Sequence, residues 1–200
     1  MIRYIPFLKA KRGELTAIGE LALNVKSFVC PFFDFPRKNS DYTEDAYVAT
    51  ARGIATSLNK HWGTKSEFYF DDLDISQKFT VLGENQYAYV LKVLQGLQVI
   101  PVVALGRTDH NDAVIQLKLN GAIDANTVAF RAELCDFEDY DAKRDEIDND
   151  LAAIFNEFEA IDLILDCRLC SGMDVSTTSQ QIAAFTRKFC KAYAVRRVIV

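Results

Sequence analysis

Short apolar segments alternate with longer amphipathic stretches along this chain, and this alternation constrains the fold more than any other feature. The short segments have the length and the β-branched or aromatic content of buried strands, and the stretches between them have helical spacing. Strands that alternate with helices specify a parallel sheet with helices packed against it. The expected strands are Tyr4–Lys9, Phe28–Phe35, Glu67–Asp71, Val99–Leu105, Thr127–Arg131, Ile161–Asp166 and Arg197–Val200.

The stretches between the strands carry recognisable helix signals. Thr43 is a predicted N-cap, Glu44 and Asp45 suit the first turn that follows it, and Gly63 ends that helix. The segment Phe79–Leu82 either adds a strand or covers the bottom of a barrel. The other expected helices are Gly13–Ala22, Glu84–Gln98, Asp109–Leu119, Asp136–Ala160 and Ser176–Tyr193.

These repeats predict an α/β fold of the TIM-barrel type, with parallel strands, in a single domain over residues 1–200 that ends at the start of strand seven. A complete eight-fold barrel usually takes about 250 residues. We therefore expect the barrel to be incomplete or truncated at its C-terminus, or to be completed by a partner segment. The alternative is an open doubly wound sheet.

Composition narrows the class of protein. No apolar run approaches the roughly 20 residues that span a bilayer, and no signal peptide opens the chain, so we expect no membrane association. Five cysteines, an odd number, fit a reducing compartment, and we expect a cytoplasmic protein. The net charge of −5 argues against a general nucleic-acid footprint, although it leaves a local basic patch open.

Charged side chains stand at or just after the ends of the predicted strands. Parallel strands all end at the same edge of a sheet, so we expect these side chains to ring one mouth, where barrels bind ligands and carry out chemistry. The set is Lys9, Asp34, Asp71, Arg107, Arg131 and Asp166, with Lys11, Glu14 and His110 in the adjoining loops.

Carboxylates that share one mouth repel each other unless a cation lies between them. Basic side chains supply that cation in one interpretation, and magnesium bound by carboxylate oxygens supplies it in another. In a third interpretation the charges are only structural. The candidate catalytic residues are Lys9, Asp34, Arg131 and Asp166, and the candidate substrate-binding residues are Lys11, Glu14, Asp71, Arg107 and His110.

Two segments near the N-terminus resemble the phage beta protein family. The first segment follows the pattern Y-x-P-x-L-K-x-K-x-G-E-x-x-A, and the second follows P-hydrophobic-acid-x-P. The order of the later strands, which end in Arg131 and Asp166, also fits the family. The matching positions are Tyr4, Pro6, Leu8, Lys9, Lys11, Gly13, Glu14 and Ala17, then Pro31, Asp34 and Pro36.

The resemblance implies a barrel-like α/β fold, an origin in phages or mobile elements, and a role in phage–host conflict, as an antidote to a toxic neighbour or in defence. The partner is then a toxin-like protein or a small phosphorylated ligand bound at the C-terminal face of the barrel. Two alternatives stay open. One is a metal-dependent hydrolase of a phosphorylated or nucleotide substrate, with Asp34, Asp71 and Asp166 as ligands. The other is a barrel that has kept its fold and lost its chemistry.

Overall fold

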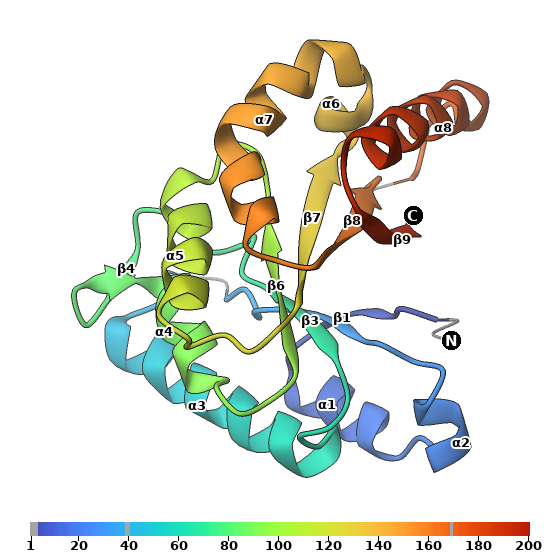
Figure 1. Ribbon diagram of the computed structural model, residues 1–200. Helices are drawn as coiled ribbons and strands as arrows, with labels where there is room; N and C mark the ends of the chain where they lie inside the picture. Colours follow the sequence, from blue (N-terminus) through green and yellow to red (C-terminus); the bar gives the residue numbers. More distant parts are fainter. Residues whose placement is uncertain (1–3, 39–40, 169) are drawn as a thin grey trace. The chain divides into compact units, whose positions relative to one another are not determined.

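A computed structural model describes residues 4–38, 41–168 and 170–200. Seven strands pair in parallel in the order β1-β2-β3-β6-β7-β8-β9, and the hairpin β4-β5 stands apart (Figure 1). The strands are β1 Phe7–Lys9, β2 Phe32–Asp34, β3 Phe68–Asp71, β4 Thr80–Val81, β5 Glu84–Asn85, β6 Val99–Val103, β7 Thr127–Glu133, β8 Ala160–Asp166 and β9 Val195–Ile199. The helices are α1 Arg12–Gly19, α2 Leu23–Lys26, α3 Glu44–His61, α4 Gln86–Val93, α5 Thr108–Leu119, α6 Leu134–Phe137, α7 Tyr140–Asn156 and α8 Val175–Ala192.

The order of the seven strands follows the order of the chain. A doubly wound sheet would reverse direction at one point, whereas strands of a barrel-type sheet follow one another as they do here. The predicted (β/α) repeats with parallel strands are therefore confirmed.

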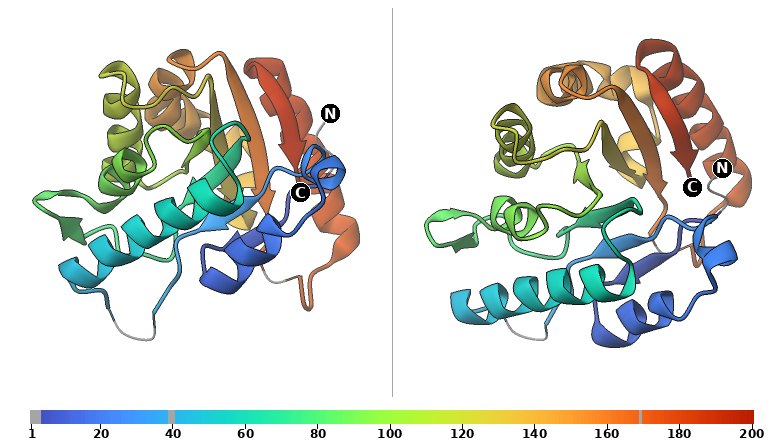
Figure 2. Two further views of the ribbon diagram at one scale, coloured as in Figure 1. Left: turned by 90° about the horizontal axis from the view of Figure 1, so that it is seen from below. Right: turned by 60° about the horizontal axis from the view of Figure 1, so that its bottom comes forward.

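The described chain divides into two compact units, residues 1–101 with 116–125 and residues 102–115 with 126–200. The single domain over residues 1–200 stays a prediction. In the first unit, β1, β2, β3 and the start of β6 form the sheet. Helices α1 and α3 lie side by side on one face of strands β1 to β3 (Figure 2). Strands β2 and β3 are buried on both faces, which explains their unbroken apolar runs: Phe32, Phe33, Phe68, Tyr69 and Phe70 are all fully buried.

Helix α3 begins and ends where its sequence signals predict. The Thr43 hydroxyl accepts a hydrogen bond from the Ala46 amide at 3.4 Å, and Glu44 and Asp45 occupy the first turn. Gly63 follows the helix with a φ of +89°, and its amide donates to the Leu58 carbonyl at 2.9 Å. Only glycine adopts this left-handed geometry without strain, so the chain turns here toward β3.

In the second unit, the end of β6 pairs with β7, and β7, β8 and β9 follow. Helix α7 connects β7 to β8, and α8 connects β8 to β9 (Figure 1). An apolar core joins these helices to the strands. Its fully or almost fully buried members include Phe130, Leu163, Ile164, Phe185 and Phe189.

Most of the predicted helices differ in their bounds, and for three of them the cause can be identified. The first turn of Glu84–Gln98 is taken by the β4-β5 hairpin, and α4 begins only after the Asn85 cap. The segment Asp136–Ala160 is divided into α6 and α7, because Asp139 caps a new helix. Helix α8 begins at Val175, after the Asp174 cap, rather than at Ser176. No helix among the described residues is both long enough and apolar enough to cross a membrane.

Candidate functional site

The ends of the first three strands bring three predicted site residues into one row. Lys9 is opposite Asp34 in the β1-β2 pairing, and Asp34 is opposite Asp71 in the β2-β3 pairing. The Lys9 ammonium donates to Asp34 Oδ2 at 2.9 Å and to Asp74 Oδ2 at 2.6 Å. We call Lys9, Asp34 and Asp74 the lysine triad. Lys9 thus lies between two carboxylates and neutralises their charge. In the absence of Lys9, a metal cation would have to do so.

The environment of Lys9 acts on its pKa in two opposite ways. Partial burial lowers the pKa, but the hydrogen bonds and negative charges of Asp74 and Asp34 outweigh this effect and raise it above 10.5. The ammonium is therefore charged at neutral pH and holds the two carboxylates together. Next to the triad, Asp71 is fully buried and accepts a hydrogen bond from the Asp72 amide at 2.8 Å.

A pocket of about 570 Å³ opens beside the triad, between the loop after β2 and the loop after β3. Asp74 belongs to both the triad and the pocket lining. The ionic side chains of the lining are three cations and two carboxylates, and none of the three cations forms an ion pair within the described part of the chain. We call this site the loop pocket. Its lining is Arg37, Lys38, Asp41, Tyr42, Leu73, Asp74, Ile75, Ser76, Lys78 and Phe79.

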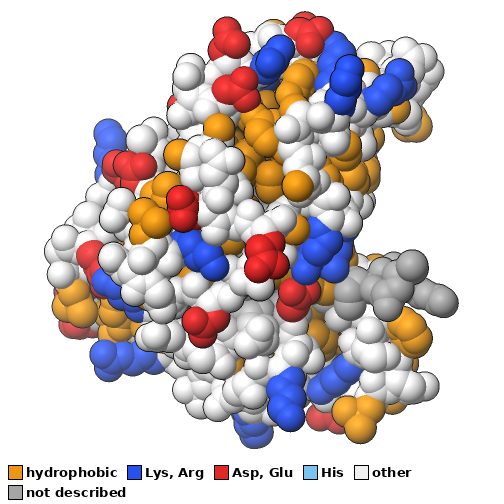
Figure 3. All heavy atoms as spheres, viewed as in Figure 1, with side chains coloured by type: hydrophobic (Ala, Val, Ile, Leu, Met, Phe, Trp, Pro, Cys, Tyr) orange, Lys and Arg blue, Asp and Glu red, His pale blue; other side chains and the backbone are white. Residues whose placement is uncertain are grey.

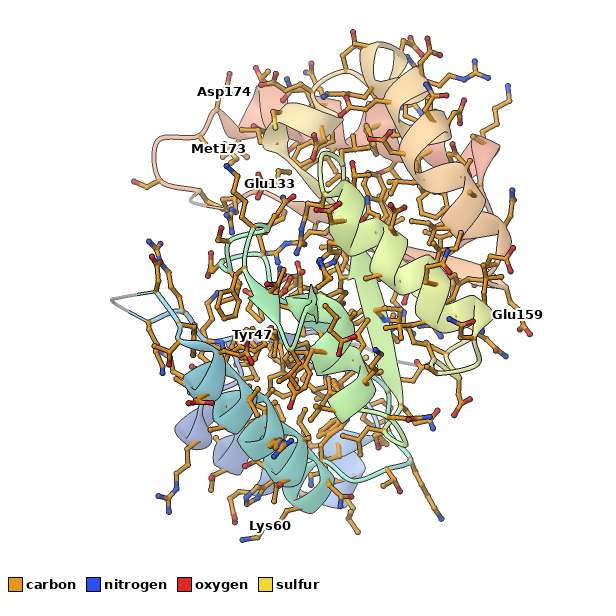
Figure 4. The ribbon with its side chains drawn as sticks, turned by 90° about the vertical axis from the view of Figure 1, so that its left-hand side faces the viewer. Tyr47, Lys60, Glu133, Glu159, Met173 and Asp174 are labelled. Carbon is orange, nitrogen blue, oxygen red and sulfur yellow. The ribbon has the colours of Figure 1, made fainter. Side chains whose placement is uncertain are left out.

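Aromatic rings hold the walls of the loop pocket in place. The Tyr42 hydroxyl donates to the Pro36 carbonyl at 2.7 Å, and the Lys38 ammonium lies 4.3 Å from the centre of the Tyr42 ring. Tyr42 and Phe79 both pack against Tyr47, with ring centres 5.5 and 5.3 Å away. Tyr47 lies on α3 and turns into the first unit, where it is fully buried (Figure 4). The pocket is therefore built before any ligand arrives.

The second unit pairs another two of the predicted site residues. Arg131, only 3% exposed, donates from Nε and Nη2 to Asp166 Oδ2 at 2.9 and 2.6 Å. The other oxygen of Asp166 accepts a hydrogen bond from the Arg168 amide at 2.8 Å. Arg131 therefore compensates the charge of Asp166.

Arg107 and His110 form a buried pair in the segment that follows β6. Arg107 Nη2 lies 2.7 Å from His110 Nδ1, and His110 Nε2 lies 2.8 Å from the Val102 carbonyl oxygen. A guanidinium only donates, so Nδ1 is the acceptor and the imidazole proton is on Nε2. Both ring nitrogens of His110 are therefore engaged by partners in the same unit.

Comparison with known proteins connects this geometry to a family. A family model described as Beta protein matches residues 4–200. The chain belongs to the Beta protein family. The match includes the strand ends that form the lysine triad and the Arg131–Asp166 pair. No curated protein and no solved structure gives a significant match.

None of the nine predicted site residues of this Beta protein family member lines the loop pocket itself, and Lys11 and Glu14 belong to neither of the ion pairs described above. Lys11 is at the N-cap position of α1 and lines a different groove. Glu14 is on the first turn of α1, and one of its carboxylate oxygens is buried without a hydrogen bond among the described residues. The roles assigned to the nine predicted site residues stay predictions.

Several residues that build the site in this Beta protein family member were not predicted. Asp74 belongs to the triad, and Arg37, Lys38, Lys78 and Tyr42 line the loop pocket. The run Asp71-Asp72-Leu73-Asp74 was a usable signal, because it carries carboxylates past the end of β3 into the loop. The polar loop 37–42 offered only a weaker one, since basic residues are common in any exposed loop.

Proposed function

We propose that this Beta protein family member binds a small phosphorylated ligand in the loop pocket. The main support for this proposal is that Arg37, Lys38 and Lys78 line a preformed pocket at the carboxyl ends of parallel strands. This edge is the usual ligand site of (β/α) folds. Cationic donors around an aromatic-walled cavity suit a phosphate group, which carries charge and accepts several hydrogen bonds.

The biological setting that we propose is phage–host conflict in the cytoplasm, as an antidote or in defence. Support comes from membership in the Beta protein family and from the motifs near the N-terminus. A pocket with fixed walls fits a protein that recognises a ligand or the exposed anionic group of a partner. In this setting, the anionic group that binds in the pocket belongs either to a signalling ligand or to the partner that the protein acts on.

Binding is favoured over metal-assisted hydrolysis by the state of two of the three candidate metal ligands. Asp34 is compensated by Lys9, and Asp166 by Arg131. A carboxylate that already holds an ammonium or guanidinium would have to release it before coordinating a divalent cation. The triad therefore serves better as a rigid base for the pocket than as a magnesium site.

Calorimetric titration with inorganic pyrophosphate, ADP and ATP tests the proposed pocket. We expect Lys78→Gln to weaken binding about tenfold, about 1.4 kcal/mol, because it removes one charged donor from the phosphate. Lys65→Gln is the matched control, since Lys65 is exposed and lies outside the pocket. In cells challenged with phage or with a toxic gene product, Lys78→Gln lowers protection and Lys65→Gln preserves it.

Two results would overturn the proposed pocket. One is the absence of binding heat with all three phosphates. The other is an equal loss of affinity in Lys78→Gln and Lys65→Gln, which would show that the loss comes only from the change in net charge. Thermal melts of both variants verify that each keeps the fold of the native chain.

A further inference from the structure

A second concave surface lies in the first unit, along helices α1 and α3 and the loop after β2. It encloses about 820 Å³. We call it the α1–α3 groove. Its lining is Ala10, Lys11, Arg12, Leu15, Thr16, Pro36, Arg37, Lys38, Tyr42, Thr50, Gly53, Ile54, Thr56, Ser57, Lys60 and His61.

The charge of the α1–α3 groove is of one sign. Five of its lining residues are lysine or arginine, and none is aspartate or glutamate. In the part of the chain that the structure describes, none of these five cations forms a salt bridge. Figure 3 shows blue lysine and arginine side chains at the lower edge of the view, over helices of the first unit. A protein of net charge −5 thus keeps a concentrated positive groove.

The exposed groups of the groove indicate which anion it fits. Its aliphatic members Ala10, Leu15, Pro36 and Ile54 are all buried, so they offer no apolar anchor to an incoming helix. The exposed side chains are cations and hydroxyls, among them Thr16, whose hydroxyl can donate to phosphate oxygens. This composition favours a phosphate backbone over an acidic protein segment.

The length of the groove matches a short stretch of nucleic acid. Its lining runs along α3 from Thr50 to Lys60, about 15 Å at the rise of an α-helix. Lys60 is on the last turn and turns away from the interior (Figure 4). Gly53 lies between these ends, with open space where a side chain would be. With phosphates about 3.4 Å apart along a stacked strand, about four nucleotides fit.

We propose that the α1–α3 groove binds the sugar–phosphate backbone of a nucleic-acid strand without regard to sequence. Lys11 and Arg12, at the start of α1, and Lys60, at the end of α3, contact the phosphates. The groove adjoins the loop pocket and shares Arg37, Lys38 and Tyr42 with it. The two sites can still be tested apart, because Lys11, Arg12 and Lys60 line only the groove and Lys78 lines only the pocket.

Fluorescence anisotropy with a labelled 12-nucleotide thymidine strand and a uridine strand of the same length tests the groove. We expect the double variant Lys11→Glu with Lys60→Glu to raise the dissociation constant at least tenfold. The matched control is Lys65→Glu with Lys191→Glu, which makes the same change in net charge at exposed sites outside the groove. The control should change the dissociation constant less than threefold, and Lys78→Gln should leave it unchanged.

The salt dependence gives a second readout. The logarithm of the binding constant falls with the logarithm of salt by about 0.7 per phosphate contact on a single strand. Replacing two contacting lysines should therefore reduce that slope by about 1.4. The milder double variant Lys11→Gln with Lys60→Gln should show the same reduction, so a folding defect in the glutamate variant would not hide the effect.

Three results would overturn the proposed groove. The first is that neither strand binds at low salt. The second is that the control variant loses as much affinity as the groove variant. The third is that polyglutamate binds with the same dependence on Lys11 and Lys60 while neither strand binds, which would assign the groove to an acidic protein partner.

Discussion

At the scale of single residues, the lysine triad makes a prediction about the titration of Lys9. Its pKa is raised, so its contribution to stability is complete below about pH 10.5 and is lost as the pH rises through the higher folded value. Asp74→Asn removes one of the two negative charges that raise this pKa, while the burial that lowers it remains. We therefore expect the Lys9 midpoint to fall in an NMR titration of the lysine side chains.

Asp41→Asn is the control for that titration. Asp41 lines the same pocket, but it makes no ion pair within the described residues. Its removal should leave the Lys9 midpoint nearly unchanged. Equal shifts from both variants, or no shift from Asp74→Asn, would show that the contact between Lys9 and Asp74 does not exist in solution.

Some residue contacts could be predicted from the sequence and others could not. Lys9, Asp34 and Asp71 fall into one row because parallel strands align their ends, and this follows from the strand pattern alone. Asp74 lies 65 positions from Lys9, in a loop whose path no periodicity specifies. Asp162 is fully buried inside β8, where the pattern predicts an apolar residue; it pairs with Arg196 at 2.6 Å and Arg197 at 3.7 Å.

At the scale of elements, helix α4 depends on its cap. The Asn85 side-chain oxygen accepts hydrogen bonds from the Tyr87 and Ala88 amides at 2.9 and 3.2 Å. Asn85→Ala leaves these amides without their partner and should cost about 1 kcal/mol of unfolding free energy, measured by urea denaturation. Asn85→Asp should retain most of the stability, because a carboxylate accepts the same bonds. A loss as large in Asn85→Asp as in Asn85→Ala would contradict the capping role.

The elements themselves were more predictable than their bounds. Helix α3 begins after Thr43 and ends before Gly63, because both residues act locally on the backbone. The start of α4 was misplaced because the β4-β5 hairpin takes Glu84 and Asn85 as a strand. Strand pairing depends on tertiary contacts, so a local helical pattern in the same residues does not reveal it.

At the scale of the whole molecule, an acidic chain carries two adjoining surfaces with clustered cations in its first unit, and Arg37 and Lys38 line both of them. The loop pocket is mixed in charge and has aromatic walls, whereas the α1–α3 groove is purely basic and open. Membership in the Beta protein family covers both surfaces. We expect them to bind different anions, a small phosphorylated ligand in the pocket and a nucleic-acid backbone in the groove.

The most direct test of the loop pocket is a ¹H–¹⁵N correlation spectrum recorded during titration with inorganic pyrophosphate. The proposed site predicts saturable shifts concentrated in the amides of 37–38, 41–42 and 73–79, and their loss in Lys78→Gln. Shifts confined to other segments, or a spectrum that pyrophosphate leaves unchanged, would contradict it.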